Sequence, residues 1–208
     1  MLRTCERAVR SVSVPGGFRV FIGLGGNVGN RIARLTEAAR AMGRLPGTKI
    51  LRLSRVYETS PVGPRQRDFL NAAAELRTIL PPIKLFRALK EIERSLGRRQ
   101  GKKWAPREID LDLLFYGRRR MKTAKLQIPH PLLRERKFVL RPLADLAPRF
   151  RDPSSGLTIA ALLRRLTAPD QRVNLYKDHN IGNGSGPRSP TVSRAGREGR
   201  PASASRPA

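Results

Sequence analysis

Residues 104–116 read Trp-Ala-Pro-Arg-Glu-Ile-Asp-Leu-Asp-Leu-Leu-Phe-Tyr, an apolar run interrupted by two aspartates. Apolar residues alternate with Asp110 and Asp112, and this period of two is typical of a β-strand. Both carboxylates then lie on one face of the strand, with their Cα atoms roughly 6 to 7 Å apart. Their oxygens can therefore converge on hard cations.

The paired aspartates suit chemistry on a polyphosphate. Mg²⁺ favours carboxylate and phosphate oxygens and keeps part of its water shell, so such a pair can hold the ion against phosphate groups. Arg107, three residues before Asp110, adds a cation that can form two hydrogen bonds to phosphate oxygens. The alternative is an amphipathic edge strand whose aspartates face water, with Arg107 as their salt-bridge partner. Spacing alone favours this alternative, but Asp is disfavoured in strands, which makes the two interpretations about equal.

Composition excludes several classes of protein. With 208 residues, 39% of them hydrophobic, the chain can bury one sizeable core. The net charge of +27 suits nucleic-acid binding, but only 5% of residues are aromatic and none form a stacking platform among basic residues, so we expect no specific nucleic acid. A single cysteine, Cys5, excludes an internal disulfide and fits a cytoplasmic location. No apolar run is as long as a membrane span, so no membrane partner is expected.

Hydrophobic periodicity predicts an α+β fold with the order β-α-β-β-α-β, the ferredoxin-like arrangement, followed by an additional C-terminal strand and helices. Strands are expected at 18–25, 49–58, 68–78 and 104–116, and helices at 28–43 and 81–96. Beyond these we expect a short strand near Leu126, a turn at 129–131, and helices near 138–146 and 157–166.

The two ends of the chain differ in composition from its centre. Residues 1–17 are a basic N-terminal extension that lacks the continuous apolar core of a secretory signal. Residues 177–208 are rich in Gly, Ser, Pro and Arg and have too little apolar surface to fold, so we expect a disordered tail. The folded domain is therefore expected to span 18–176.

Several motifs, in a fixed order, are similar to those of a known enzyme family. They are Gly23-Leu24-Gly25-Gly26-Asn27, residues 57–64, Phe69-Leu70-Asn71, Glu93 with Gly97-Arg98, the aspartate strand, and Pro129-His130 with Arg136 and Phe138. From about Val20 to about Leu166 the chain resembles the 6-hydroxymethyl-7,8-dihydropterin pyrophosphokinases of folate biosynthesis. The resemblance implies transfer of the terminal pyrophosphate of ATP, the co-substrate, to the hydroxymethyl group of the reduced pterin, giving AMP. It also implies two Mg²⁺ ions as cofactors.

The resemblance assigns roles to individual residues. It implies that the pterin is bound by Gly25, Thr59, Ser60, Val62, Phe69, Asn71, Trp104 and Phe138, with Phe138 stacked on the ring and Trp104 on a closing loop. It implies that ATP is bound by Glu93, Arg98, Arg107, Ile109, His130 and Arg136, and the metal by Asp110 and Asp112. The catalytic residues it implies are Arg98, Arg107, Asp110 and Asp112. The structural alternatives are a proline-flanked His130 that only shapes a turn and arginines that are only surface charge.

Four residues depart from the pattern of the family. Phe69 is often Tyr there, Ser60 often Pro and Lys90 often Gln, and Pro131 follows His130 where other residues occur. None of these changes removes a metal ligand or a phosphate-binding cation. No general base is evident, and Asp110, Asp112 or solvent could take the proton of the substrate hydroxyl. The rival functions are a basic nucleic-acid binder on the same fold and a noncatalytic relative that partners another folate enzyme. We expect a monomer that binds ATP and the pterin.

Overall fold

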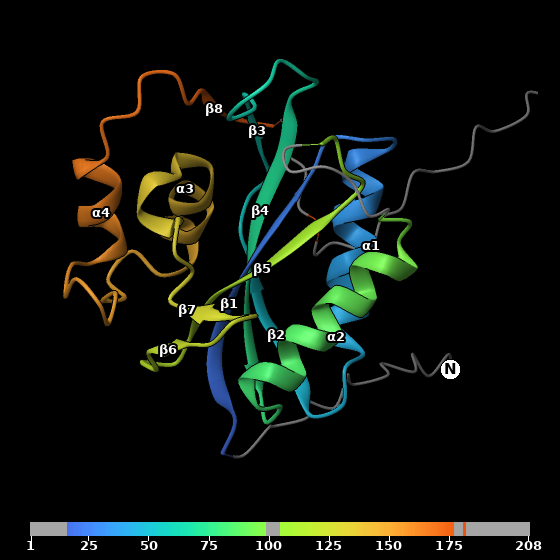
Figure 1. Cartoon of the computed structure of the whole chain (residues 1–208), viewed down its shortest axis with the longest axis vertical. Helices are drawn as coiled ribbons and strands as arrows, with labels where there is room; N and C mark the ends of the chain where they lie inside the picture. The colour runs from blue at the N-terminus through green and yellow to red at the C-terminus, as the bar shows by residue number, and fades with distance from the viewer. Residues whose placement is uncertain (1–15, 99–104, 177–180, 182–208) are drawn as a thin grey trace, which may run out of the picture.

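The computed structural model describes residues 16–98, 105–176 and 181, and in them one large sheet separates two layers of helices (Figure 1). One face of the sheet is covered by α1 (Arg31–Gly43) and α2 (Pro82–Ser95), and the other by α3 (Lys137–Leu146) and α4 (Ile159–Arg165). The large sheet contains β1 (Phe18–Gly26), β2 (Thr48–Leu53), β3 (Tyr57–Thr59), β4 (Phe69–Thr78), β5 (Asp110–Tyr116) and β8 (Val173–Leu175). A small hairpin of β6 (Met121–Lys122) and β7 (Gln127–Ile128) and a 3₁₀ turn (Leu133–Glu135) lead from β5 to α3.

The large sheet is antiparallel throughout the described residues. Its strands follow the order β5-β1-β4-β3-β8, and β2 also pairs with β4. Each of these pairings is antiparallel. The chain therefore has a mixed helix-and-sheet fold in which β5 lies at one end of the strand order.

Each face of the sheet buries its own apolar cluster. On β1 the side chains of Val20, Ile22 and Leu24 join the cluster under α1 and α2, whereas Phe21 joins the cluster under α3 and α4. This division follows from the two-residue period of a strand. On β5 the same alternation turns Leu111 toward the α1 and α2 layer, so the aspartates on either side of it face α3.

The predicted strand at 104–116 is wrong in its first half, because β5 begins only at Asp110. The residues before it bond to the end of β1 instead: the Arg107 carbonyl accepts the N–H groups of Asn27 and Val28 at 2.9 and 3.3 Å. Pro106 also has no N–H to offer a strand partner. Arg107 is therefore held by a loop contact and not by the strand.

The predicted strand at 49–58 is also wrong, because it is two strands, β2 and β3, that both pair with β4. The pairing of β2 shifts register between Ile50 and Arg52. Just beyond β2, the Ser54 hydroxyl accepts a hydrogen bond from the Ala73 N–H at 2.8 Å, in place of a regular strand contact. A side chain that replaces a backbone partner interrupts the strand, which hydrophobic alternation alone does not predict.

The helices predicted at 28–43, 81–96, 138–146 and 157–166 are confirmed as α1 to α4, and the strand near Leu126 corresponds to β7 of the small hairpin. The sequence did not predict β8, which pairs with β3. Ile181 lies within the predicted tail, yet it is buried in the cluster under α1 and α2. Residues 1–15, 177–180 and 182–208 lie outside the described residues.

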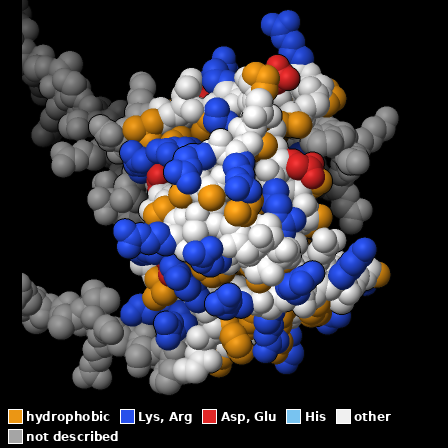
Figure 2. All heavy atoms as spheres, turned by 90° about the vertical axis from the view of Figure 1, so that its left-hand side faces the viewer, with side chains coloured by type: hydrophobic (Ala, Val, Ile, Leu, Met, Phe, Trp, Pro, Cys, Tyr) orange, Lys and Arg blue, Asp and Glu red, His pale blue; other side chains and the backbone are white. Residues whose placement is uncertain are grey.

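Basic side chains are spread over the face formed by α3 and α4 (Figure 2). Arg164 and Arg165 in the last turn of α4 are exposed members of this surface. Among the described residues, none of the helices has the length and apolar character needed to cross a membrane.

Candidate active site

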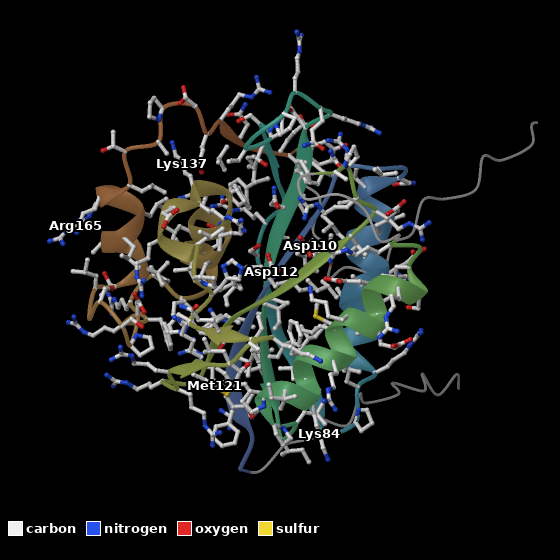
Figure 3. The ribbon with its side chains drawn as sticks, viewed as in Figure 1. Lys84, Asp110, Asp112, Met121, Lys137 and Arg165 are labelled. Carbon is white, nitrogen blue, oxygen red and sulfur yellow. The ribbon has the colours of Figure 1, made fainter. Side chains whose placement is uncertain are left out.

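The two aspartates of β5 lie opposite glycines of β1. Asp110 pairs with Gly25 and Asp112 with Gly23, so the residue opposite each aspartate on β1 has no side chain. Gly25 also pairs with Asn71 on its other side, and a Cβ at Gly25 would lie 2.5 Å from the Asn71 Oδ1 atom. Only glycine fits there. Figure 3 shows both aspartates on β5, between α2 and α3.

The first cavity in front of the aspartates, here called the Phe138 cavity, combines aromatic, amide and charged side chains. Asn71 is buried at its base and donates a hydrogen bond from Nδ2 to the Thr59 Oγ1 atom at 2.7 Å, which fixes the orientation of the amide. The lining residues are Gly23, Leu24, Gly25, Thr59, Ser60, Val62, Gln66, Phe69, Asn71, Ala72, Arg107, Asp110, Asp112, Arg136, Phe138 and Val139.

A second cavity, here called the His130 cavity, lies between β5, α2 and the small hairpin. Its lining residues are Phe86, Asp112, Leu113, Thr123, Ala124, Lys125, Leu126, Gln127, His130 and Pro131. Asp112 lines both cavities, so two separate binding spaces meet at one carboxylate.

Asp110 is surrounded by cations. Its Oδ1 atom lies 2.5 Å from Arg98 Nη1 and 3.7 Å from Lys90 Nζ, and its Oδ2 atom lies 2.8 Å from Arg107 Nη1. Burial would raise the pKa of Asp110, but the charges of Lys90, Arg98 and Arg107 outweigh burial and hold the pKa below its ordinary value. This carboxylate therefore stays ionised well into acid.

Asp112 has the opposite environment. Within the described part of the chain, no hydrogen bond or ion pair reaches its carboxylate. Burial, and then the charge of Asp110, raise the pKa of Asp112. A half-buried carboxylate without a protein partner is costly in isolation, and this one lies where two cavities meet. The arrangement favours a cationic ligand at this point.

Two further buried nitrogen atoms, His130 Nδ1 and Arg107 Nε, have no hydrogen-bond partner among the described residues. Both belong to side chains that line the cavities. Burial lowers the pKa of His130 despite the nearby charge of Asp112, so the imidazole is neutral at pH 7 and keeps one N–H donor. Unpaired buried polar atoms of this kind mark a site that a polar ligand completes.

The donor set fits Mg²⁺ that is bound together with phosphate groups. Among the described residues, no group of three or more His, Cys, Asp or Glu side chains could hold a metal ion alone. Mg²⁺ is commonly bound by one or two carboxylates, with waters and substrate phosphates completing its octahedron. Asp110 and Asp112 supply those carboxylates, and Arg98, Arg107 and Arg136 lie close enough to share the phosphate charge.

Most of the predicted site residues come together around Asp110 and Asp112, but three of the described ones, Arg98, Glu93 and Ile109, line neither cavity. Ile109 is fully buried in the core, and the Glu93 carboxylate is only 3% exposed and bonded to protein groups. Trp104 lies outside the described residues. The prediction missed Gln66, which lines the Phe138 cavity, and Lys90, whose spacing of three from Glu93 on a helix was the available signal.

The sequence places this chain in a class of kinases that transfer pyrophosphate. Residues 21–148 match the family model described as 7,8-dihydro-6-hydroxymethylpterin-pyrophosphokinase, and the chain belongs to this family. The predicted family and activity are therefore confirmed: the chain is a diphosphokinase of folate biosynthesis, with ATP and the hydroxymethyldihydropterin as substrates.

Individual relatives agree with the family match. The 2-amino-4-hydroxy-6-hydroxymethyldihydropteridine pyrophosphokinase of Synechocystis sp. is 42% identical over 145 residues, which are 70% of this chain and 74% of that protein. The folate synthesis bifunctional protein of Arabidopsis thaliana is 50% identical over 128 residues, 61% of this chain but only 23% of that longer protein. The Plasmodium falciparum HPPK-DHPS structure with pterin and p-hydroxybenzoate superposes with a TM-score of 0.58 at 17% identity, covering 71% of this chain and 43% of that one. This last similarity concerns the fold alone.

Proposed function

We propose that the pterin binds in the Phe138 cavity, the nucleotide binds in the His130 cavity, and pyrophosphate passes between them at Asp110 and Asp112. The observation that carries this proposal is that Asp112 lines both cavities. A group transferred from one ligand to the other must pass the point where the two binding spaces meet. Substrates held on either side of that point react as if at high effective concentration.

The Phe138 cavity has the chemistry that a flat heterocycle requires. The rings of Phe69 and Phe138 offer apolar faces for stacking, which leaves the edge of a pterin free for hydrogen bonds. Asn71 offers an amide donor and acceptor at that edge, and Thr59 fixes the amide orientation. Ser60, Val62 and Gly25 complete the walls and allow the ring to approach the backbone.

The His130 cavity combines an apolar wall with basic groups. Phe86 and Leu126 provide apolar surface for a base, while Lys125 and His130 lie where phosphate groups would follow. Arg98, Arg107 and Arg136 are proposed to bind the triphosphate, because guanidinium groups can donate paired hydrogen bonds to phosphate oxygens. Trp104, by its resemblance to family residues, is proposed to cover the pterin.

Two Mg²⁺ ions are proposed to be held by Asp110 and Asp112. When bound, they would neutralise phosphate charge during the transfer. The substrate hydroxyl attacks the β-phosphorus in line, the new O–P bond forms as the bond to the α-phosphate oxygen breaks, and AMP leaves. The hydroxyl proton passes to Asp110, to Asp112 or to solvent.

We also propose that the described sheet is ferredoxin-like. If β2 and β3 count as one interrupted strand, the strands run β5, β1, β4 and β2/β3 across the sheet, which is the order of a split βαβ fold. The proposed domain spans 18–176, between a basic extension at 1–17 and a tail at 177–208. A cytoplasmic monomer remains our proposal for its location and assembly.

The proposal is tested by measuring AMP release from ATP and Mg²⁺ with and without 6-hydroxymethyl-7,8-dihydropterin. We expect AMP only when the pterin is present, and loss of AMP formation in Asp110→Asn. Glu37→Gln is the matched control, because Glu37 is an exposed carboxylate of α1 that pairs only with Arg34 in the described residues. ADP as the product, or undiminished AMP formation by Asp110→Asn, would contradict the proposal.

A further inference from the structure

The strand that carries the two aspartates is fixed at its outer edge by side chains of α2. One edge of β5 pairs with β1, and its opposite edge has no strand partner in the described sheet. At Leu111 both outward backbone groups are nevertheless satisfied: its N–H donates to Glu93 Oε1 at 2.6 Å, and its carbonyl accepts from Lys90 Nζ at 3.0 Å. Leu111 is the residue between Asp110 and Asp112.

Glu93 is fully engaged by protein groups. Its side chain is 3% exposed, and its Oε1 atom accepts from Lys90 Nζ at 2.6 Å in addition to the Leu111 N–H. Its Oε2 atom lies 2.5 Å from Arg98 Nη1. A buried carboxylate is retained at acceptable cost only when charged and hydrogen-bonding partners surround it in this way. Glu93 thus has no exposed face for a nucleotide, in contrast to the predicted direct contact with ATP.

The same cations connect Glu93 to the site. The Nη1 atom of Arg98 lies 2.5 Å from both Glu93 Oε2 and Asp110 Oδ1, and Lys90 Nζ lies 3.7 Å from Asp110 Oδ1. Arg98 is therefore shared between a structural carboxylate and a proposed metal ligand. If Arg98 turns to the triphosphate, Lys90 keeps Glu93 paired.

We infer that Lys90 and Glu93, one turn apart on α2, are positioning residues for the reaction. Both fix β5 at Leu111. Lys90 also keeps Glu93 paired, so that Arg98 can turn and bind the nucleotide. The inference rests on the proposed roles of Asp110, Asp112 and Arg98. Lys90 acts on the nucleotide side, because its ammonium lies 5.6 Å from the centre of the Phe86 ring, which lines the His130 cavity. Of the other groups it contacts, Leu111, Glu93 and Asp110, only Asp110 lines the Phe138 cavity. Loss of the Lys90 side chain should weaken the binding of ATP and leave the binding of the pterin unchanged.

The test compares Lys90→Gln with Lys84→Gln in the full-length chain. Lys84 is an exposed lysine of the same helix (Figure 3), so both variants remove one positive charge from α2. We expect Lys90→Gln to raise the KM for ATP about tenfold and to leave the KM for the pterin unchanged, with only a small loss of Tm because Arg98 still pairs with Glu93. Binding of ATP with Mg²⁺, measured by calorimetry without pterin, should weaken by a similar factor. Lys84→Gln should behave as the wild type.

A second set of variants separates positioning from general stability. Lys90→Arg should restore ATP affinity, because a guanidinium can donate to both Glu93 and Leu111. In a double-mutant cycle, Lys90→Gln and Glu93→Gln should be less damaging together than the sum of their separate effects, since each removes the charge that the other balances. Parallel loss of Tm, ATP binding and pterin binding in Lys90→Gln would overturn the inference, and so would unchanged ATP binding.

The outcomes also separate this inference from the proposed function. Normal ATP binding by Lys90→Gln, with Asp110→Asn inactive, would reject only the positioning role. Full activity of Asp110→Asn would reject the proposed site, whatever Lys90→Gln shows.

Discussion

Two carboxylates on the face of the sheet that α3 covers, the buried Glu75 and the half-buried Asp112, have opposite surroundings. Glu75 on β4 lies 2.7 Å from Arg19 Nε and 2.5 Å from Arg52 Nη2, and Arg52 continues to the carbonyl of Leu146 at the end of α3. Asp112 on β5 has neither a hydrogen bond nor an ion pair from any described residue. Glu75 is here called the closed carboxylate, because protein groups pair with both of its oxygens. Asp112 is called the open carboxylate, because it lines two cavities and has no such partner among the described residues.

The difference separates a carboxylate that stabilises the fold from one that is proposed to bind a ligand. The closed group joins β1, β2 and β4 to the end of α3, so its partners belong to the scaffold. The open group keeps an unpaired charge that costs stability unless a ligand neutralises it.

The largest effect is expected when the negative charge of Asp112 is removed. In Asp112→Asn we expect kcat to fall on the order of a thousandfold, because the proposed metal and phosphate contacts require a carboxylate. The Tm should stay the same or rise, because the raised pKa of Asp112 means that ionisation of this group is unfavourable in the folded protein. Steady-state AMP formation and thermal unfolding measure the two effects. A lower Tm would mean that Asp112 is a scaffold group after all.

The reverse result is expected for the closed carboxylate. Glu75→Gln should lower the free energy of unfolding by about 2 kcal/mol, less than for a wholly buried pair because Arg19 and Arg52 are 42% and 51% exposed. Urea denaturation measures this loss. The kcat of the folded variant should stay within about twofold of the wild-type value. A large loss of activity without loss of stability would break the comparison.

A smaller effect is expected at Asn27, which joins the scaffold to the open site. Its Nδ2 atom donates to Gln66 Oε1 and the Arg67 carbonyl at 2.9 and 3.0 Å, and its Oδ1 accepts from the Arg107 N–H at 2.9 Å. Asn27→Asp replaces the donor by an oxygen that repels two acceptors. We expect the KM for ATP to rise about tenfold as Arg107 loses its position. Steady-state kinetics measure the change, and Asn174→Asp on β8 is a surface control.

The smallest effect is expected in the pH dependence of stability. It concerns a third carboxylate, Asp152, which is closed by protein partners as Glu75 is. Burial would raise the pKa of Asp152, but hydrogen bonds from Arg134 Nε at 2.7 Å and Ser155 Oγ at 2.6 Å outweigh burial and lower it. A depressed folded pKa stabilises the protein above the unfolded pKa of about 3.9, and this stability is lost as pH falls through the folded pKa.

Asp152→Asn should therefore cost about 1 kcal/mol at pH 7 and progressively less as the pH falls below 4. Urea denaturation at a series of pH values measures this dependence. The sign is opposite for Asp112, whose raised pKa makes the folded protein less stable as pH rises through the range between its unfolded and folded values. An Asp152→Asn variant whose deficit grows in acid would contradict the assignment of Asp152 as a closed carboxylate.

The sequence predicted the features of this comparison that depend on local geometry. The alternation around Asp110 and Asp112 was sufficient to put both carboxylates on one face, because strand period is a local property. The helices could be predicted for the same reason. The glycines opposite the aspartates could not, since the register of β1 with β5 joins residues about 90 positions apart.

The features that the sequence did not predict depend on contacts between residues far apart in the chain, and composition does not reveal such contacts. The strand β8 forms because Val173 to Leu175 meet β3, and Ile181 is buried although its neighbours in sequence are polar. In the sequence Lys90 cannot be distinguished from other lysines of a helix, because its contact with β5 is seen only in the folded structure. Tertiary pairing, and not intrinsic propensity, determines such positions.

The contacts of α2 with Leu111 also bear on solubility. An unpaired strand edge can recruit a strand from another molecule and so begin aggregation. At Leu111 that edge is already occupied, because Glu93 takes its N–H and Lys90 takes its carbonyl. The charge of Lys90, which reaches this edge from α2, further discourages an incoming strand. The residues proposed to align the aspartates thus also protect the outer edge of β5 against self-association.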